Sequence, residues 1–546
     1  MHAQTVFLGG PVHTVDAARP WCTAVAVVEG RVAAVGQEHD VRDFIGPRTE
    51  VVDLQGKLLL PGFQDAHVHP VFAGLQLLDC DLGSARSADD YLAVVADYAA
   101  SHPERSWIRG GGWTFTAFGM AMPTREQLDS VVSDRPVYLS VRDVHSAWVN
   151  SRALELAGID ERTDDPAGGR IERDANGRPS GVLHEQAMEL VARFLPEPTM
   201  DDLRAALTTA QRHLHSLGIT AWQDALVGSY GGQPDPLDTY LDGARSGLLT
   251  ARVRGALGWD PDQGLEQIGS LLERRERGRA GRFTAATVKI IQDGIPENGT
   301  AALTDPYLDK CGCPTDNRGH SMVEPERLKR AVTQLDAHGF QLHFHAIGDR
   351  ALTEILDALE HARKTNGDTG LRHHIAHLQV VRPEDVSRFR ALDVTANIQP
   401  LWAAHDDQMD DLCIPVLGEQ RAAWQFPFGD LRRAGVTLAA GSDWGVTSAD
   451  PLLGIHVAVN RVLPDVHGKR EVFLPEQRLD LAAAIRAYTA GSAYANHLDD
   501  TGSITVGNRA DLVFLDRDPF DGPPEHIAHT RVLRTYIEGT LVHAVD

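Results

Sequence analysis

The chain has 546 residues, of which 42% are hydrophobic and 23% are charged, a composition typical of a globular protein with a large core. Its formal net charge of −24 argues against nucleic acid and anionic membranes as partners, because both attract basic surfaces. Five cysteines are too few for a disulfide framework, and neither a signal peptide nor a long apolar run is evident. We therefore expect a cytoplasmic protein without a membrane span.

The two ends of the chain share one pattern of short β-branched runs separated by Gly and Asp, which predicts β-strands. Because chain termini often lie close together in a compact domain, we expect residues 1–60 and 499–546 to form one β-sandwich domain. The expected strands are Thr5–Leu8, Ala24–Val28, Arg31–Val35, Glu50–Leu54, Gly502–Gly507, Ala510–Leu515 and Val532–Gly539.

Between these ends, residues 61–498 alternate between apolar strand-like runs and helical stretches such as Glu324–His338 and Arg350–Arg363. This alternation is typical of an α/β fold of the (β/α)₈ TIM-like barrel type, with an open sheet as the alternative. The eight expected strands are Leu58–His69, Ile219–Trp222, Ala251–Leu257, Ala286–Ile291, Phe340–His345, His374–Leu378, Val394–Ile398 and Val436–Ala440.

A long segment, residues 72–200, interrupts the alternation directly after the first expected barrel strand. An insertion at the carboxyl end of a barrel strand would lie over the mouth of the barrel, where barrel enzymes bind their substrates. We interpret residues 72–200 as an inserted substrate-shaping region.

Histidines and an aspartate recur at the ends of the expected barrel strands, namely His67, His69, His345, His377 and Asp443. His67 and His69 are two residues apart and therefore share one strand face, so both imidazoles can reach one ion. Nitrogen and oxygen ligands of this kind suit zinc or another divalent ion of similar preference. The alternative is that these are ordinary core residues among 25 histidines, but their matching positions favour a metal site. His343 shares a strand face with His345, and the pattern alone leaves the choice between them open.

Eight motifs together resemble the amidohydrolase superfamily and, within it, the amidohydrolase-3 or YtcJ-like family. The resemblance covers nearly the whole chain and implies a TIM-like barrel with a β-sandwich built from both termini. It also favours His345 over His343 as the ligand, because Ala-Ile-Gly-Asp follows His345 directly. The motifs are Leu60–His69, Asp143–Leu154, Val288–Gly294, His345–Ala351, Ile375–Val381, Gly441–Asp443, Gly502–Gly507 and Ala510–Asp516.

The resemblance implies one or two divalent ions, with zinc expected, and adds Lys289 as a carboxylated lysine that bridges two ions. A bare lysine has no lone pair to offer while it is protonated, so carboxylation is what would make Lys289 a ligand. Many relatives carry an acidic residue where this chain has Ala376. We expect this difference to alter the polar surroundings that orient the imidazole of His377 and not its role as a ligand.

The function implied is a metal-dependent amidohydrolase that cleaves a carbon–nitrogen bond other than a peptide bond, with N-substituted formamide as the first substrate. Asp443 is the expected general acid and base, with His145 as a second catalytic candidate. The residues Trp113, Glu185 and Asp293 are the candidate substrate contacts. A hydrolytic deaminase or cyclic-amide hydrolase is the alternative, and a non-enzymatic ligand-binding barrel is the remote one. The expected partner is a small amide-type molecule, and the resemblance is compatible with a homodimer.

Overall fold

The computed structural model describes residues 2–83, 85–119, 122–142, 146–166, 169–229, 234–309, 311–464 and 471–545. His145 lies outside these residues. The chain forms two compact units. We call them the main unit, comprising Met1–His69, Gln211–Val227 and Tyr240–Asp546, and the inserted unit, comprising Pro70–Ala210 and Gly228–Thr239.

The main unit is built around a nearly closed barrel of parallel strands, which confirms the predicted fold class. The eight strands follow chain order, and each of the eight expected runs overlaps one of them. The ring closes just beyond the first and last strands, where the amide of Asp443 donates to the carbonyl of His67 (2.7 Å) and the amide of His69 donates to Trp444 (3.0 Å). The strands are β8 (Phe63–Val68), β15 (Ile219–Val227), β16 (Arg252–Gly258), β18 (Phe283–Ile291), β19 (Gln341–Ala346), β20 (His374–His377), β21 (Thr395–Ile398) and β22 (Leu438–Ala440).

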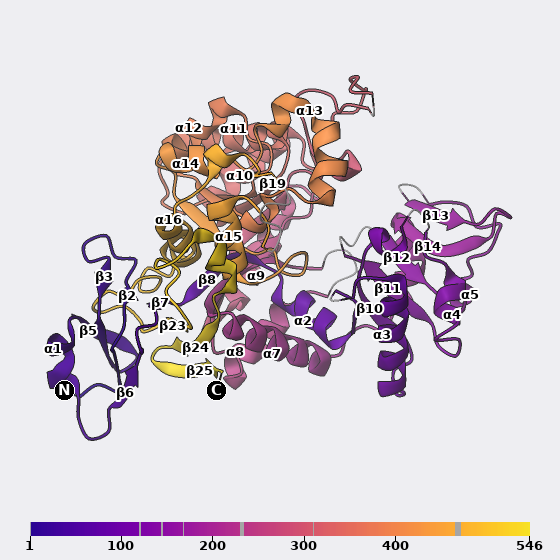
Figure 1. Ribbon diagram of the computed structural model, residues 1–546. Helices are drawn as coiled ribbons and strands as arrows, with labels where there is room; N and C mark the ends of the chain where they lie inside the picture. Colours follow the sequence, from indigo (N-terminus) through magenta and orange to yellow (C-terminus); the bar gives the residue numbers. More distant parts are fainter. Residues whose placement is uncertain are drawn as a thin grey trace. The chain divides into compact units, whose positions relative to one another are not determined.

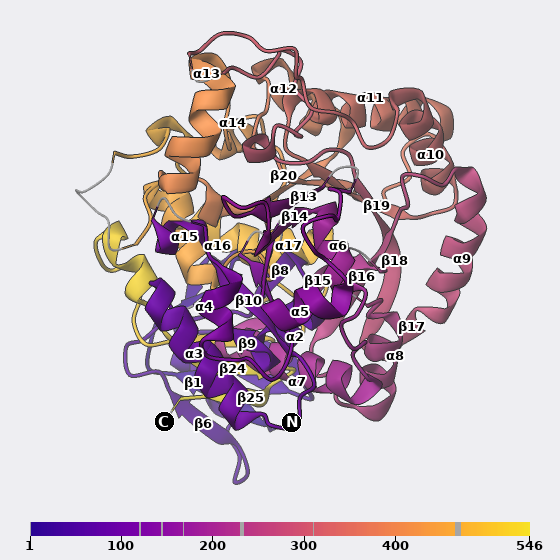
Figure 2. The same ribbon diagram turned by 90° about the vertical axis from the view of Figure 1, so that its right-hand side faces the viewer.

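Helices α8 (Leu237–Ser246), α9 (Ile268–Arg277), α10 (Pro325–Ala337) and α11 (Asp349–Asn366) lie outside the arc of strands (Figure 2). Helices α7 (Met200–Ser216), α12 (Pro383–Leu392) and α14 (Phe428–Arg433) separate further strand pairs along the chain. The start of α10 shows how the sequence sets a boundary. The carboxylate of Glu324 accepts from the amides of Glu326 and Arg327, and Pro325 occupies the first helical position.

The two chain ends meet in a β-sandwich, whose sheets have the strand orders β5-β4-β1-β6 and β25-β24-β23-β7-β2-β3 (Figure 1). Its core combines residues from both termini, among them Phe7, Val25, Leu512 and Tyr536. The N-terminal strands are β1 (Thr5–Leu8), β2 (Val12–His13), β3 (Trp21–Cys22), β4 (Ala24–Val28), β5 (Arg31–Gly36), β6 (Glu50–Asp53) and β7 (Leu59–Pro61). The C-terminal strands are β23 (Leu512–Leu515), β24 (Val532–Ile537) and β25 (Thr540–Ala544).

One expected strand, Gly502–Gly507, is instead a turn segment. Gly502 and Gly507 both have positive φ angles, 73° and 94°, which an extended strand does not use. The segment still joins the sandwich, because the amide of Ile504 donates to the carbonyl of Thr14.

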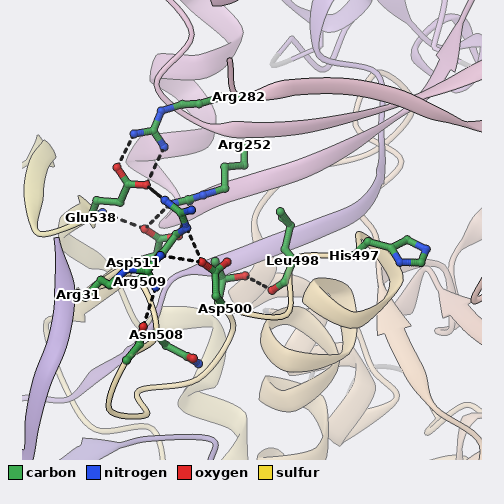
Figure 3. A network of polar contacts seen from close by, with 12 residues as sticks. Arg31, Arg252, Arg282, His497, Leu498, Asp500, Asn508, Arg509, Asp511 and Glu538 are labelled. Carbon is green, nitrogen blue, oxygen red and sulfur yellow. Dashed lines mark hydrogen bonds and ion pairs between the residues drawn. The ribbon is translucent and has the colours of Figure 1, made fainter. Parts of the chain in front are cut away.

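An arginine and carboxylate network joins the sandwich to the amino-terminal ends of barrel strands β16 and β18 (Figure 3). Arg252 pairs with Asp511 at 2.6 Å and with Glu538 at 2.8 Å, and both Arg252 and Asp511 are buried. Arg282 pairs with the second oxygen of Glu538 at 2.6 Å, and Arg509 also binds this carboxylate. The network therefore holds parts of the main unit that lie far apart in the sequence.

The inserted unit contains a six-stranded sheet with the order β13-β14-β12-β11-β10-β9. The large side chains of Tyr91, Trp113 and Trp148 fill its core beside helix α3 (Ala88–Ser101). The strands are β9 (Cys80–Asp81), β10 (Ile108–Trp113), β11 (Val137–Val141), β12 (Ser146–Val149), β13 (Gly169–Arg173) and β14 (Pro179–Glu185). In the part of the chain that the structure describes, no helix combines the length and hydrophobicity needed to cross a bilayer.

Candidate metal centre

Three potential ligands meet where the first and last barrel strands come together. His67 is the penultimate residue of β8, His69 follows that strand, and Asp443 follows β22. The Nε2 atoms of His67 and His69 lie 3.4 Å and 3.2 Å from Oδ1 of Asp443. The ligand atoms of these three residues all lie within 4.8 Å of one another, a spacing that could hold one metal ion.

Two further imidazoles and a lysine belong to the same cluster. The ring centroid of His377 lies 4.7 Å from that of His67 and 4.4 Å from that of His345. Lys289 is buried on β18 and lies close enough to act electrostatically on His67 and His345. The structure thus brings together all six of the residues predicted from the sequence as metal ligands.

Four buried atoms of this cluster have no hydrogen-bond partner among the described residues. They are Nζ of Lys289, Nε2 of His345, Nδ1 of His377 and Oδ1 of Asp443. Leaving one such group buried and unpaired costs about 1–3 kcal/mol, so four in one place need an explanation. A metal ion fits, because it would be bound by lone pairs that no protein hydrogen now occupies.

The protonation states of the cluster also suit metal binding. Burial lowers the pKa of both His67 and His345 to about 3, and the nearby charge of Lys289 adds to the effect. Both imidazoles are therefore neutral at physiological pH and keep a lone pair, as a metal ligand requires. Burial also lowers the pKa of Lys289 to about 7, so a large fraction of this amine is uncharged near neutral pH.

The backbone at the site is held in an unusual conformation. His377 and Asp443 have φ angles of 76° and 55°, in the left-handed region that residues with a Cβ rarely adopt. Such a conformation costs on the order of 1–3 kcal/mol and is typical of functional sites. The amide of His377 donates to Oε1 of Gln399 at 2.7 Å, and this contact holds the strained residue in place.

Asp65 supports the first ligand and was not singled out in the sequence. Its carboxylate accepts from the amide of His67 at 2.9 Å and from the hydroxyl of Ser442 at 2.5 Å, and so ties β8 to the segment before Asp443. Burial raises its pKa to about 7 despite these contacts. The available signal was the spacing, because Asp65, His67 and His69 share one strand face.

Trp402 is a second residue at the site that sequence reasoning missed. Its ring is stacked on that of His377, with centroids 5.1 Å apart and planes 4° apart. It lies in the short turn Pro400–Trp402 directly after β21, so its position after a barrel strand was the available signal.

The candidate substrate contacts have diverse surroundings. Both carboxylate oxygens of Asp293 are buried and accept from the amides of Ala302, Ile347 and Gly348, so this residue fastens the loop after β18 to the turn after β19. Trp113 packs in the core of the inserted unit, and its indole donates to a backbone carbonyl. Glu185 is exposed at the end of β14 in the inserted unit.

Comparison with known proteins adds a family match over most of the chain. A model described as "Amidohydrolase family" matches residues 50–543. Protein LONG AFTER FAR-RED 3 of Arabidopsis thaliana is 32% identical over 98% of this chain and 91% of its own length. The putative amidohydrolase YtcJ of Bacillus subtilis is 31% identical over 99% of both chains. N-substituted formamide deformylase of Arthrobacter pascens is 28% identical over 98% of this chain and 97% of its own length.

Among solved structures, the fold resembles an uncharacterized metal-dependent hydrolase from Pyrococcus furiosus. The two chains are 27% identical and superpose with a TM-score of 0.75. The match covers 95% of this chain and all of the other.

Proposed function

We propose that this chain, which belongs to the amidohydrolase family and resembles a solved metal-dependent hydrolase, cleaves an amide-type carbon–nitrogen bond other than a peptide bond. N-substituted formamides are the first substrate class that we propose, on the strength of the relative that is 28% identical over nearly the full length. The observation that carries the proposal is the set of four unpaired buried atoms at the carboxyl end of the barrel.

The proposed metal ligands are the group His67, His69 and Asp443 together with the neighbouring His345 and His377. Zinc suits this set of imidazole and carboxylate donors, as one ion or as two. When bound, such a metal acts as a Lewis acid toward the substrate carbonyl and increases the acidity of water near neutral pH.

Lys289 is proposed to join the ligands as a carbamate. Its unpaired nitrogen is buried among the histidines, and an uncharged amine can attack carbon dioxide, forming a carbon–nitrogen bond and releasing one proton. The product replaces a potential cation with an anionic oxygen donor, which a divalent ion prefers. No other lysine stands among the residues of this cluster.

Asp443 is the proposed general base and acid. Its Oδ1 atom is buried and makes no well-directed hydrogen bond, although Nε2 of His69 lies 3.2 Å away, so this oxygen can accept a proton from the attacking water. The same carboxyl group then delivers the proton to the leaving nitrogen as the carbon–nitrogen bond breaks. An amine and a carboxylic acid are the products, which for a formamide are the amine and formate.

The inserted region, residues 72–200, is proposed to shape the substrate site. His145, Trp113 and Glu185 come from this region, and their contact with substrate remains a prediction. Substrate-selecting residues of barrel enzymes commonly lie in segments that extend from the strand ends, and the inserted unit starts at Pro70, directly after His69.

A substrate screen with matched chemistry tests the proposal. The metal-loaded protein is incubated with N-substituted formamides, the corresponding acetamides, cyclic amides and exocyclic amino compounds, and formate, amine and ammonia are measured. Formate and amine in equal amounts are the expected products. Ammonia without an organic amine would instead support the deaminase alternative, and turnover of none of the four classes would contradict the proposal.

A further inference from the structure

Beneath the candidate metal centre, His67 is hydrogen-bonded to two further buried side chains, His343 and Gln223, which the proposed chemistry does not use. Oε1 of Gln223, on β15, lies 2.6 Å from Nδ1 of His343, on β19. Nε2 of the same imidazole lies 3.0 Å from Nδ1 of His67. Gln223 and His343 have no exposed surface, and His67 is 1% exposed.

The chemistry of these groups determines which atom donates and which accepts in each of the two hydrogen bonds. A carbonyl oxygen can only accept, so Nδ1 of His343 carries the hydrogen that Gln223 receives. A neutral imidazole has one N–H, which leaves Nε2 of His343 as an acceptor. Nδ1 of His67 must then donate, and its Nε2 atom, 3.4 Å from Asp443, keeps a lone pair.

Two observations favour the neutral form of His343. The residue forms no ion pair within the described ranges, so a charged ring would be buried without a counter-ion. Its ring also packs against that of His374, with centroids 4.1 Å apart and planes tilted by 40°. A doubly protonated His343 would moreover donate to His67 and force the proton of His67 onto the atom that faces Asp443.

Further hydrogen bonds are made by residues of the neighbouring strand β21. Asn397, on β21, donates to the carbonyl of Ala66 at 2.8 Å, and its amide nitrogen lies 3.2 Å from Nδ1 of His374. Gln399 in turn donates to the side-chain oxygen of Asn397. The ring of His343 lies between the rings of His67 and His374, at centroid distances of 4.7 Å and 4.1 Å.

We propose that Gln223 and His343 are positioning residues, which set the tautomer of His67 so that its Nε2 lone pair is available to the metal. The inference rests on the proposed metal site, because it assigns a role to groups behind one of the ligands. It also separates the two histidines of β19. His345 presents an unpaired nitrogen to the cluster, whereas both nitrogens of His343 are hydrogen-bonded one layer below.

The opposite orientation of the Gln223 amide would have the opposite effect. An N–H facing His343 would reverse both hydrogen bonds and place the proton of His67 on Nε2, where it blocks metal binding. Metal affinity is therefore sensitive to the acceptor at position 223, beyond any effect on packing. Groups that orient metal-bound histidines typically contribute 10- to 100-fold to affinity.

Chelator competition with zinc, in the metal-depleted full-length protein, tests the proposal directly. Gln223→Leu removes the acceptor and should weaken zinc binding by about 10- to 100-fold. Gln223→Glu keeps an acceptor at the same place and should restore binding to within about 3-fold of wild type. Gln223→Asn is too short to reach His343 and should bind as weakly as the leucine variant while remaining polar, which covers the case in which Gln223→Leu fails to fold.

Gln341 provides the matched control. It is a buried barrel glutamine whose side chain bonds Thr287 and two backbone carbonyls, away from the ligands. Gln341→Leu should lower the unfolding temperature without changing zinc affinity. Cobalt absorption spectra of the folded variants provide a second readout, and they should change in Gln223→Leu and Gln223→Asn only.

The outcomes distinguish a failure of the positioning role from a failure of the proposed function. Wild-type zinc affinity in folded Gln223→Leu, or equal weakening in Gln223→Leu and Gln223→Glu, would overturn the positioning role while the metal site stands. A wild-type protein that binds neither zinc nor cobalt would overturn the proposed function itself, and the positioning role with it.

Discussion

Glu538 offers a quantitative test of the contacts that join the β-sandwich to the barrel (Figure 3). Its carboxylate is surrounded by the guanidinium groups of Arg252, Arg282 and Arg509. Burial alone would raise its pKa, but the hydrogen bond from Arg282 and the charges of Arg252 and Arg282 lower it from 4.5 to about 2. We therefore predict that Glu538→Gln, which keeps the size of the side chain and removes its charge, destabilises the main unit.

The size of the effect follows from the pKa of Glu538. A fall from 4.5 to about 2 corresponds to about 3.4 kcal/mol, at 1.36 kcal/mol per pKa unit. The side chain is 25% exposed, and glutamine retains some hydrogen bonds, so we expect a loss of about 2 kcal/mol at pH 7. Because the pKa of Glu538 is lower in the folded state than in the unfolded state, its carboxylate contributes its full stabilisation at pH values above the unfolded-state pKa. This contribution decreases as the pH falls toward the folded-state pKa. The difference between wild type and variant should therefore shrink by about 1 kcal/mol between pH 7 and about pH 3.5.

Urea unfolding at both pH values, followed by intrinsic tryptophan fluorescence, measures this difference. Glu525→Gln serves as the control because Glu525 is exposed, and its change in stability should stay within about 0.5 kcal/mol. A Glu538→Gln variant as stable as the control at pH 7 would refute the reasoning. So would a difference that grows as the pH falls.

Three further substitutions test individual groups of the site. Asp443→Asn should leave the metal content largely intact and lower kcat by at least about 100-fold, because proton transfer is lost; normal turnover beside normal metal content would exclude that role. Lys289→Ala should abolish the carbamate signal that wild type gives in ¹³C NMR after incubation with ¹³C-bicarbonate, and the same signal in both proteins would place the carbamate elsewhere. Asp293→Asn should cost about 1–3 kcal/mol in urea unfolding, because an amide nitrogen cannot accept from the backbone amides that the carboxylate serves; unchanged stability would contradict the role of Asp293 in fastening the loop.

The barrel could be predicted from the sequence because its strands are buried runs that alternate with helical segments, apart from the insertion after the first strand. Parallel strands of this kind have a simple sequence pattern, and their order in the barrel follows chain order. The turn segment Gly502–Gly507 shows the limit. Its apolar residues resemble a strand, but both of its glycines have positive φ angles, and the amide of Gly507 donates to the carbonyl of Val32.

The candidate ligands could be proposed from the sequence because histidine at a barrel strand end is chemically distinctive. The residues behind them are less distinctive, since Gln223 and Asp65 look like ordinary polar residues of strands and Gln399 like an ordinary polar residue directly after one. Their roles depend on which side chain of another strand each one faces, and this depends on the register between strands. His343 illustrates the point. The sequence pattern places it on the same strand face as His345, but it does not show that His345 belongs to the metal cluster whereas His343 lies behind it.

The most direct test of the proposed metal centre is elemental analysis paired with activity. The purified protein is analysed for bound metals, depleted with a chelator and reloaded with zinc, and the hydrolysis of its best amide substrate is measured at each step. At least one divalent ion per chain, loss of activity on depletion and recovery on reloading are the predicted results. A metal-free protein that keeps full activity would contradict the account.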